Sequence, residues 1–389
     1  MSAGFRDCVA TGKTILRWAN LRTSHVVKML VPGTIFLMSS VPTDNRLELA
    51  AGWHSLPPEY AIPERAPSLE EAQQYCARLA HSHYENFSVV TWFLPRHLHR
   101  HFYNVYAYCR ISDDLGDEVG DPQQALALLD AWEGELNATY LSLIEPPPVD
   151  VRKDVEKLQA ESPAKNQANP RHPVFVALRE TIREFDIPRA PFADLLTAFR
   201  QDQTVSRYPT FESVLGYCKN SANPVGHLVL YVCGYRDAER QQLSDYTCTA
   251  LQLANFWQDV AVDYGKGRIY LPLESLAKFG VSESDIAERR ATPQFRELMK
   301  FEVTRAREWF AMGLPLAAKV DKHLAIDIEL FSRGGLEILK AIERQDYDVL
   351  THRPAISKPR KLWLVGRAAL GKLAGGKGDF TTEPRKAQK

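Results

Sequence analysis

The chain of 389 residues is 45% hydrophobic and 25% charged, an ordinary composition for a soluble globular protein that allows one large core or two domains. Its 48 basic and 48 acidic residues cancel, so the overall charge indicates neither a nucleic acid nor an acidic partner. The six cysteines form no CxxC pair and no metal-binding spacing, which is typical of reduced thiols in a cytoplasmic protein.

Residues 1–65 show no clear periodic pattern. The apolar run from Met29 to Val41 is interrupted by Pro32 and Gly33, so it is too short and broken to span a bilayer, and no convincing secretory cleavage site follows it. We expect residues 1–65 to form a poorly structured appendage, separate from a catalytic domain at residues 66–352.

Helical periodicity becomes regular at Ser68, where Ser68-Leu69-Glu70-Glu71 has the pattern of a capping box. Apolar stripes at helical spacing, or helix-start signals, then predict helices at 96–119, from Asp121-Pro122 onward, and at 174–185, 192–203, 211–231, 244–263, 293–312 and 324–344. The charged, proline-containing stretch 145–173 predicts a long surface excursion within one domain. No alternating strand pattern competes, so we predict an all-α bundle of about ten or more helices around a central apolar cavity.

Residues 353–389 form a basic C-terminal tail, in which apolar residues such as Leu362 and Trp363 are interleaved with lysines and arginines. This composition is consistent with peripheral contact with an anionic membrane surface. It is equally typical of a disordered tail that keeps the protein soluble. The expected location is the cytoplasm, with peripheral contact at the inner face of the membrane as an additional prediction.

The helix predicted at 96–119 carries the first of two acidic motifs, Asp113-Asp114-Leu115-Gly116-Asp117. At about 100° per residue, Asp113 and Asp117 project from one face. Tyr106 and Arg110 fall within the same arc, so a phenol and a cation lie beside the carboxylates.

The helix predicted at 244–263 carries the second motif, because Gln252, Asn255, Asp259 and Asp263 follow one another at single-turn spacing. The other positions of this segment are largely apolar, and a polar strip in such surroundings indicates the wall of a cavity. After Gly265, where the helix is expected to end, the chain adds Lys266, Arg268 and Tyr270, which are donors for phosphate oxygens.

Carboxylates placed this close together repel one another unless a cation lies between them. Mg²⁺ accepts oxygen ligands and keeps waters and substrate phosphates in its shell, so the two motifs together predict a Mg²⁺ site for a diphosphate. A solvated acidic face is the alternative interpretation of either motif alone. The presence of two motifs favours the metal site.

These motifs resemble those of the squalene/phytoene synthase family, the trans head-to-head prenyl synthases. The resemblance covers about residues 66 to 350 and rests on Tyr106-Ala107-Tyr108-Cys109-Arg110 before Asp113-x-x-x-Asp117, on the Gln252 to Asp263 strip, and on Arg268-Ile269-Tyr270-Leu271-Pro272. It implies an isoprenoid-synthase-type helical bundle in which both motifs bind Mg²⁺ and the substrate diphosphate across an apolar cavity.

The resemblance also implies roles for individual residues. Mg²⁺ ligands are expected at Asp113, Asp117, Asn255, Asp259 and Asp263, with Asp114 as a weaker candidate. Substrate-binding residues are expected at Tyr84, Asn86, Phe87, Tyr217, Gln252, Lys266, Arg268 and Tyr270, and catalytic residues at Tyr106, Arg110 and Asn223. Asp202 resembles a further acidic position of the family, although a single charge is weak evidence.

Within the family, two stretches look most like the hydroxysqualene synthase branch of bacterial hopanoid pathways: His83-Tyr84-Glu85-Asn86-Phe87, and the run from Tyr217 to Gly226 that contains Ser221-Ala222-Asn223. Both depart from the usual phytoene synthase pattern. That branch ionises presqualene diphosphate, rearranges the cation and lets water capture it. Such capture requires a polar group in an apolar pocket, and Tyr84, Asn86 and Asn223 are the candidates. The alternative for Asn223-Pro224 is a turn or helix kink.

Several other functions remain open. Within the family, the chain could instead condense two prenyl diphosphates to presqualene diphosphate and squalene, or to phytoene. A terpene cyclase has similar acidic motifs but would lack the Tyr-x-x-x-Arg turn before the first one. A catalytically inactive helical partner that binds prenyl diphosphates is the alternative from a different class, and the intact ligand sets argue against it. The expected partners are a prenyl diphosphate substrate and other enzymes of the squalene pathway, and no nucleic acid.

Overall fold

The computed structural model describes residues 56–82, 94–144 and 169–357, together with residues 359, 360, 363 and 366. Helices account for the regular structure of these residues, which include no strand, and the one isolated bridge pairs Arg207 with Ile269. The all-α prediction is confirmed. Within the described ranges, every helix is too short or too polar to serve as a membrane span.

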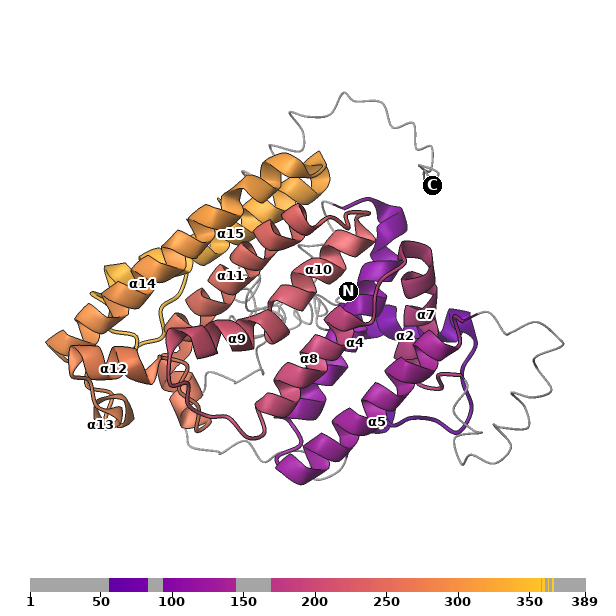
Figure 1. The fold of residues 1–389 in the computed structure, drawn as a ribbon, viewed down its shortest axis with the longest axis horizontal. Coiled ribbons are helices and arrows are strands. Elements are labelled where there is room, and N and C mark those ends of the chain that lie inside the picture. The colour runs from indigo at the N-terminus through magenta and orange to yellow at the C-terminus, as the bar shows by residue number, and fades with distance from the viewer. Residues whose placement is uncertain are drawn as a thin grey trace, which may run out of the picture.

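The helices follow one another along the chain and pack into one bundle (Figure 1). Their bounds are α2 Leu69–Ser82, α4 His99–Asp117, α5 Pro122–Leu141, α7 Pro173–Phe185, α8 Ala190–Gln201, α9 Phe211–Ser221, α10 Asn223–Val232, α11 Ala238–Gly265, α12 Leu273–Phe279, α13 Glu283–Ala287, α14 Pro293–Gly313 and α15 Lys322–Arg344. Three 3₁₀ turns, η3 Pro58–Tyr60, η4 Arg96–Leu98 and η6 Leu314–Lys319, complete the set. The two acidic motifs lie on α4 and α11.

Local sequence signals explain where several helices begin. The capping box predicted before α2 is present, because the Ser68 backbone N–H donates to Glu71 Oε2 (2.9 Å) and the Glu71 N–H donates to Ser68 Oγ (3.3 Å). At α5 the Asp121 side chain accepts from the Gln123 N–H and Pro122 occupies the first turn, as predicted.

The prediction of one continuous helix over residues 211–231 is wrong. The segment 211–231 is divided into α9 and α10, which meet at Ala222. Pro224, in the first turn of α10, has no N–H to donate to the preceding turn, so the single ladder of hydrogen bonds is broken there. The kink named as the alternative for Asn223-Pro224 is therefore present.

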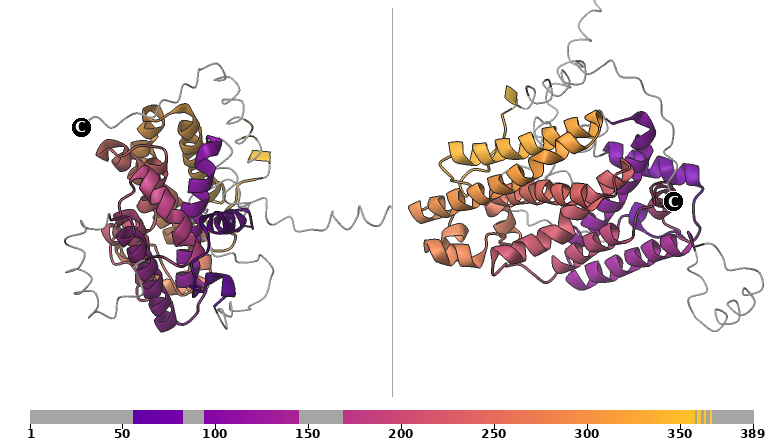
Figure 2. Two further views of the ribbon diagram at one scale, coloured as in Figure 1. Left: turned by 90° about the vertical axis from the view of Figure 1, so that its right-hand side faces the viewer. Right: turned by 45° about the horizontal axis from the view of Figure 1, so that its top comes forward.

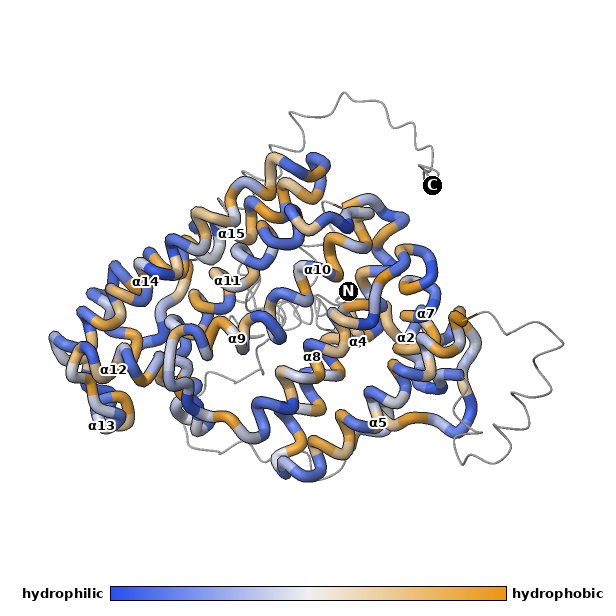
Figure 3. The backbone as a smooth tube through the Cα atoms, viewed as in Figure 1, coloured by the Kyte–Doolittle hydropathy of each residue, from blue (hydrophilic) through white to orange (hydrophobic). Residues whose placement is uncertain are grey.

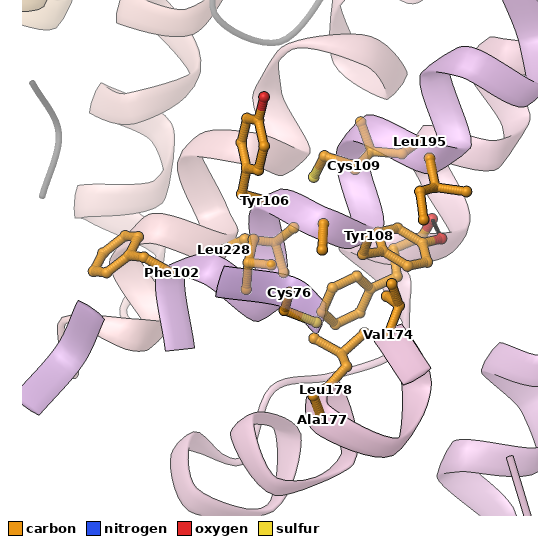
Figure 4. Packing of buried hydrophobic residues seen from close by; sticks show 14 of the residues in the cluster. Cys76, Phe102, Tyr106, Tyr108, Cys109, Val174, Ala177, Leu178, Leu195 and Leu228 are labelled. Carbon is orange, nitrogen blue, oxygen red and sulfur yellow. Dashed lines mark hydrogen bonds between the residues drawn. The ribbon is translucent and has the colours of Figure 1, made fainter. Parts of the chain in front are cut away.

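The buried side chains form two clusters. One lies between α2, α4, α5, α7, α8 and α10, and Figure 4 shows its centre, where Tyr108 of α4 lies beside Val174 of α7. The other fills the space between α9, α11, α12, α14 and α15. Figures 1 and 2 show α14 and α15 side by side along one flank, with α5 on the opposite flank. In Figure 3 apolar and polar residues alternate along the outer helices, as an amphipathic bundle requires.

The packed part of the chain extends beyond residues 66–352 at both ends. Tyr60, in the predicted appendage, is buried in the first cluster, and Ile356, in the predicted tail, is buried in the second. Arg360 donates to both carboxylate oxygens of Glu337 on α15 (3.0 and 2.8 Å). Residues 1–55 of the appendage, and residue 358 and most residues after 360 in the tail, lie outside the described residues.

Close packing of α14 against α11 predicts that Gly313→Ala will destabilise the fold. The Gly313 backbone is right-handed helical (φ −82°), so space and not conformation limits the site. A Cβ atom there would lie 2.8 Å from the backbone nitrogen of Thr247, which cannot move aside as a side chain can. We expect a loss of about 1–3 kcal/mol in the free energy of unfolding, measured by denaturant titration. Gly134→Ala in α5 is the matched control, because a Cβ there meets nothing within 4 Å and should stabilise by about 0.5–1 kcal/mol.

Candidate active site

The first acidic motif is buried in the bundle. Asp113 and Asp114 of α4 are 5% and 2% exposed. Burial raises the pKa of Asp113 well above its ordinary value, and the neighbouring carboxylates of Asp117 and Asp114 raise it further. The ionised form of Asp113 therefore requires a cation that the surrounding protein does not fully supply.

Asp114 is already engaged by two other side chains. Arg110, one turn earlier, forms a bidentate pair with it, from Nη2 to Oδ1 (2.5 Å) and from Nε to Oδ2 (2.9 Å). The Tyr60 hydroxyl donates to Oδ2 at 2.7 Å. Burial raises the pKa of Asp114 to about 6, and the Arg110 charge and the Tyr60 hydrogen bond limit the rise. Both oxygens of Asp114 are thus occupied by protein donors.

The second motif is equally buried on α11. Gln252, Asn255 and Asp259 are 2%, 5% and 1% exposed. Burial raises the pKa of Asp263 well above its ordinary value, the Asp259 carboxylate adds to the rise, and Lys266 and Arg268 oppose it. The buried Asn255 Oδ1 accepts no hydrogen bond in the part of the chain that the structure describes.

The two motifs meet through the cations that follow α11. Gly267 adopts a positive φ of 81°, which a glycine tolerates without strain, and the chain turns back at the helix end. Arg268 Nη1 then lies 3.0 Å from Asp117 Oδ1, and Lys266 Nζ lies 3.6 Å from Asp117 Oδ2. Asp117 belongs to the first motif, and its carboxylate also adds to the pKa rise of Asp263 in the second. The acidic rows of α4 and α11 therefore face one common site.

Asp202, a weakly supported candidate in the sequence analysis, lies in the same site. It follows α8, and its Oδ2 accepts from the Tyr217 hydroxyl at 2.8 Å, while its buried Oδ1 has no partner among the described residues. Burial raises the pKa of Asp202 to about 7, against the lowering effect of Arg268. Tyr217 and Tyr270 belong to an aromatic group that includes Phe256, whose ring stacks on Tyr270 at 3.8 Å between centroids.

Arg353 is a residue of the site that sequence reasoning missed. It lies at the start of the predicted tail, yet its guanidinium pairs with both oxygens of Asp259, with Nη2 3.1 Å from Oδ2. Gln258 holds the same segment, because its amide donates to the Pro354 carbonyl at 2.6 Å. Nothing in the sequence distinguishes Arg353 from the other cations of the tail.

The structure places the predicted catalytic residues as follows. Tyr106 is 1% exposed, and in Figure 4 its hydroxyl points away from the core cluster around Tyr108. Asn223 is buried at the start of α10, where its Oδ1 accepts from Thr249 Oγ1 of α11 at 3.0 Å. The predicted substrate-binding residues Tyr84, Asn86 and Phe87 lie outside the described residues, and the central apolar cavity stays a prediction.

The donor set of this site suits Mg²⁺. It consists of buried carboxylates and one amide oxygen, the Asn255 Oδ1 that lacks a partner, and Mg²⁺ prefers oxygen ligands. Among the described residues, no three carboxylate, imidazole or thiol groups lie close enough together to hold a metal ion by themselves. Mg²⁺ commonly completes its shell with waters and substrate phosphate oxygens.

Comparison with known proteins identifies related sequences. The squalene/phytoene synthase family profile matches residues 80–360. The phytoene synthase of Arthrospira platensis is 27% identical over 313 residues, which are 77% of this chain and 93% of the relative. The 15-cis-phytoene synthase of Synechococcus elongatus is 30% identical over 319 residues, which are 78% of this chain and 94% of the relative.

Two solved structures are similar in fold. Squalene synthase HpnC from Alicyclobacillus acidocaldarius matches with a TM-score of 0.62 and 44% identity, over 72% of this chain and 95% of that chain. A dehydrosqualene synthase in complex with a ligand matches with a TM-score of 0.61 and 23% identity, over 79% of this chain and 98% of that chain. The expectation of an isoprenoid-synthase-type bundle is confirmed by these likenesses.

Proposed function

The chain belongs to the squalene/phytoene synthase family of prenyl-condensing enzymes, and we propose that it is a Mg²⁺-dependent member that converts presqualene diphosphate to hydroxysqualene with loss of diphosphate. The 44% identity to a squalene synthase supports the squalene side of the family, since the two phytoene synthases compared above are 27% and 30% identical. The Tyr217 to Gly226 stretch, which departs from the phytoene synthase pattern, supports the same choice.

The observation that carries this proposal is the contact of Arg268 and Lys266 with Asp117. It brings the carboxylates of α4 and α11 to one place and sets two cations among them. The predicted ligands Asp113, Asp117, Asn255, Asp259 and Asp263 would hold Mg²⁺ there. When bound, Mg²⁺ supplies positive charge that neutralises the diphosphate and helps it to leave.

In the proposed reaction the C–O bond of presqualene diphosphate breaks, and the electron pair leaves with the diphosphate. Arg268, Lys266 and Arg110 stabilise the charge that develops on the departing oxygens. An aromatic ring stabilises a passing carbocation without offering it a strong nucleophile, and Tyr217, which contacts Asp202, is the proposed residue for this role. After rearrangement, a water oxygen bonds to the cation and releases a proton, so the products are hydroxysqualene, diphosphate and a proton.

We predict that Asn223→Ala loses control of this last step. The Thr249 hydroxyl donates a hydrogen bond to Asn223 Oδ1. This bond fixes the orientation of the Asn223 amide and leaves its NH₂ group to donate to a water. The variant should still release diphosphate, but hydroxysqualene should fall from the sole product to less than about half, with hydrocarbons formed by proton loss in its place. Mass analysis of the products tests this, and an Asn223→Ala enzyme that still gives only hydroxysqualene excludes Asn223 as the water holder.

A second candidate function is condensation of two prenyl diphosphates, to presqualene diphosphate and squalene or to phytoene. The 30% identity to a 15-cis-phytoene synthase supports this second function.

We also propose a cytoplasmic location with peripheral membrane contact through the basic tail. The lysines and arginines of the tail and the lipid nature of the proposed substrate support this location.

One assay tests the proposed function. Purified full-length protein is incubated with Mg²⁺ and either presqualene diphosphate or farnesyl diphosphate, and the products are identified by mass. Hydroxysqualene from presqualene diphosphate, dependent on Mg²⁺, is the expected result. Product from farnesyl diphosphate alone would establish the condensing function instead. Failure of the protein to convert any prenyl diphosphate would favour the alternative function, a catalytically inactive protein that binds prenyl diphosphates.

A further inference from the structure

The N-terminal segment before α2 reaches the first acidic motif through one side chain. Tyr60 is 8% exposed, and its hydroxyl donates to Asp114 Oδ2 at 2.7 Å, across 54 positions of sequence. Tyr60 lies ahead of residues 80–360, which match the family, and inside the segment that the sequence predicted to be an appendage. The contact therefore joins the first motif to a residue that the family profile does not cover.

The backbone around Tyr60 is built to hold the phenol in place. Pro57 and Pro58 fix two successive φ angles, and the 3₁₀ turn η3 is closed by the Tyr60 N–H, which donates to the Pro57 carbonyl at 2.8 Å. The ring packs in the first core cluster. A side chain restricted in this way loses little further entropy when its hydroxyl makes a hydrogen bond.

The partner of this hydrogen bond orients a predicted catalytic cation. Asp114 holds Arg110 in a bidentate pair that uses two of the five N–H donors of the guanidinium. The opposite edge of the guanidinium keeps its donors for another anion. Arg110 also interacts electrostatically with Asp113, so it stands beside the carboxylates of the common site.

We propose that Tyr60 is a positioning residue: its hydroxyl fixes the Asp114 carboxylate, which in turn holds Arg110 in the orientation that binds the substrate diphosphate. The inference rests on the function proposed above and extends it to a part of the chain outside the matched family region. In this arrangement Asp114 acts through Arg110. The bidentate pair alone leaves the carboxylate and guanidinium free to swing together about their side-chain bonds, and the Tyr60 hydrogen bond restricts that movement.

The test measures binding of inorganic diphosphate to the full-length protein at saturating Mg²⁺ by calorimetry. Tyr60→Phe removes the hydroxyl and keeps the ring. We expect its dissociation constant to rise about 5- to 10-fold, the size of one typical hydrogen bond, because Tyr60 acts on the diphosphate only indirectly. Tyr140→Phe is the matched control: it deletes a hydroxyl that donates to the Ile187 carbonyl at 2.9 Å, away from both acidic motifs, and should leave diphosphate binding unchanged.

A double-mutant cycle establishes the route of the effect. In an Asp114→Ala background, Tyr60→Phe should change diphosphate binding by less than about 2-fold, because the residue through which Tyr60 acts is gone. An equal loss in both backgrounds would overturn the proposal, as would a Tyr60→Phe protein that binds diphosphate like wild type. If Asp114→Ala does not fold, the comparison of Tyr60→Phe with Tyr140→Phe still tests the proposal. Equal diphosphate binding by these two variants would overturn it. Wild-type protein that binds diphosphate but does not convert presqualene diphosphate would overturn the proposed reaction and leave the role of Tyr60 standing.

Discussion

Replacing Asp113 by asparagine should lower turnover by about 10³-fold while leaving the metal-free protein at least as stable as wild type. Asn has nearly the same shape but no charge, so it replaces a predicted carboxylate ligand of Mg²⁺ with a neutral amide oxygen without opening a cavity. Loss of one element of electrostatic stabilisation at a reacting centre typically costs about 10²- to 10³-fold in rate. The upper end is expected here because Asp113 is almost completely buried, where charge interactions are strongest.

The stability of this variant follows from the raised pKa of Asp113. A carboxyl group whose pKa is higher in the folded state contributes stability below its unfolded pKa of about 3.8, and loses that contribution as pH rises through the folded pKa. At pH 8 without metal, the buried charge of Asp113 therefore destabilises wild type, and Asp113→Asn relieves it. The midpoint of thermal unfolding in EDTA should be equal or higher in the variant at pH 8, and the difference should shrink at pH 5.

The control for Asp113→Asn is Asp130→Asn on α5. The Asp130 side chain is 72% exposed and pairs with Arg200, so its replacement should change stability by less than about 0.5 kcal/mol and leave turnover unchanged. Addition of Mg²⁺ and diphosphate should raise the unfolding midpoint of wild type and of Asp130→Asn, but much less that of Asp113→Asn. An Asp113→Asn enzyme that turns over within about 10-fold of wild type would remove Asp113 from the metal site.

The sequence predicted the long helices because a helix of several turns repeats its apolar face often enough to be recognised. It missed α12 and α13, which contain 7 and 5 residues and show no full repeat. It also joined α9 to α10, since the apolar spacing continues through Ala222 and only the missing N–H of Pro224 breaks the ladder.

The acidic rows could be predicted for the same reason, because their carboxylates recur at single-turn spacing on two helices. Tyr60 and Arg353 could not, and Asp202 was suggested only weakly, by its resemblance to a further acidic position of the family. Each is an isolated side chain, and two of their contacts span 54 and 94 positions of sequence. Only the three-dimensional path of the chain brings such residues to the site. The domain limits predicted at residues 65 and 352 passed over Tyr60 and Arg353 because both stretches look irregular in sequence.

Arg268→Gln should lower turnover by about 10²- to 10³-fold, the second large effect that the site predicts. Arg268 contacts Asp117 directly at 3.0 Å, and its charge lowers the pKa of Asp202 and of Asp263. Its removal takes a neighbouring cation from those carboxylates and a donor from the departing diphosphate. Arg268→Lys should recover only part of the rate, since lysine keeps the charge but lacks the planar fork of donors.

Two further variants separate the role of Arg268 from a general loss of charge. Lys266 lies farther from Asp117 (3.6 Å) and its side chain is 34% exposed, so solvent screens it and Lys266→Gln should cost only about 10-fold. Arg290 is 50% exposed and pairs with Asp285 and Glu288 away from the acidic motifs, so Arg290→Gln should leave turnover unchanged. The rate loss should therefore follow the order Arg268, Lys266, Arg290, measured as diphosphate release from a prenyl diphosphate. If Lys266→Gln and Arg268→Gln lost rate equally, a summed positive field would explain the site better than a directed contact from Arg268.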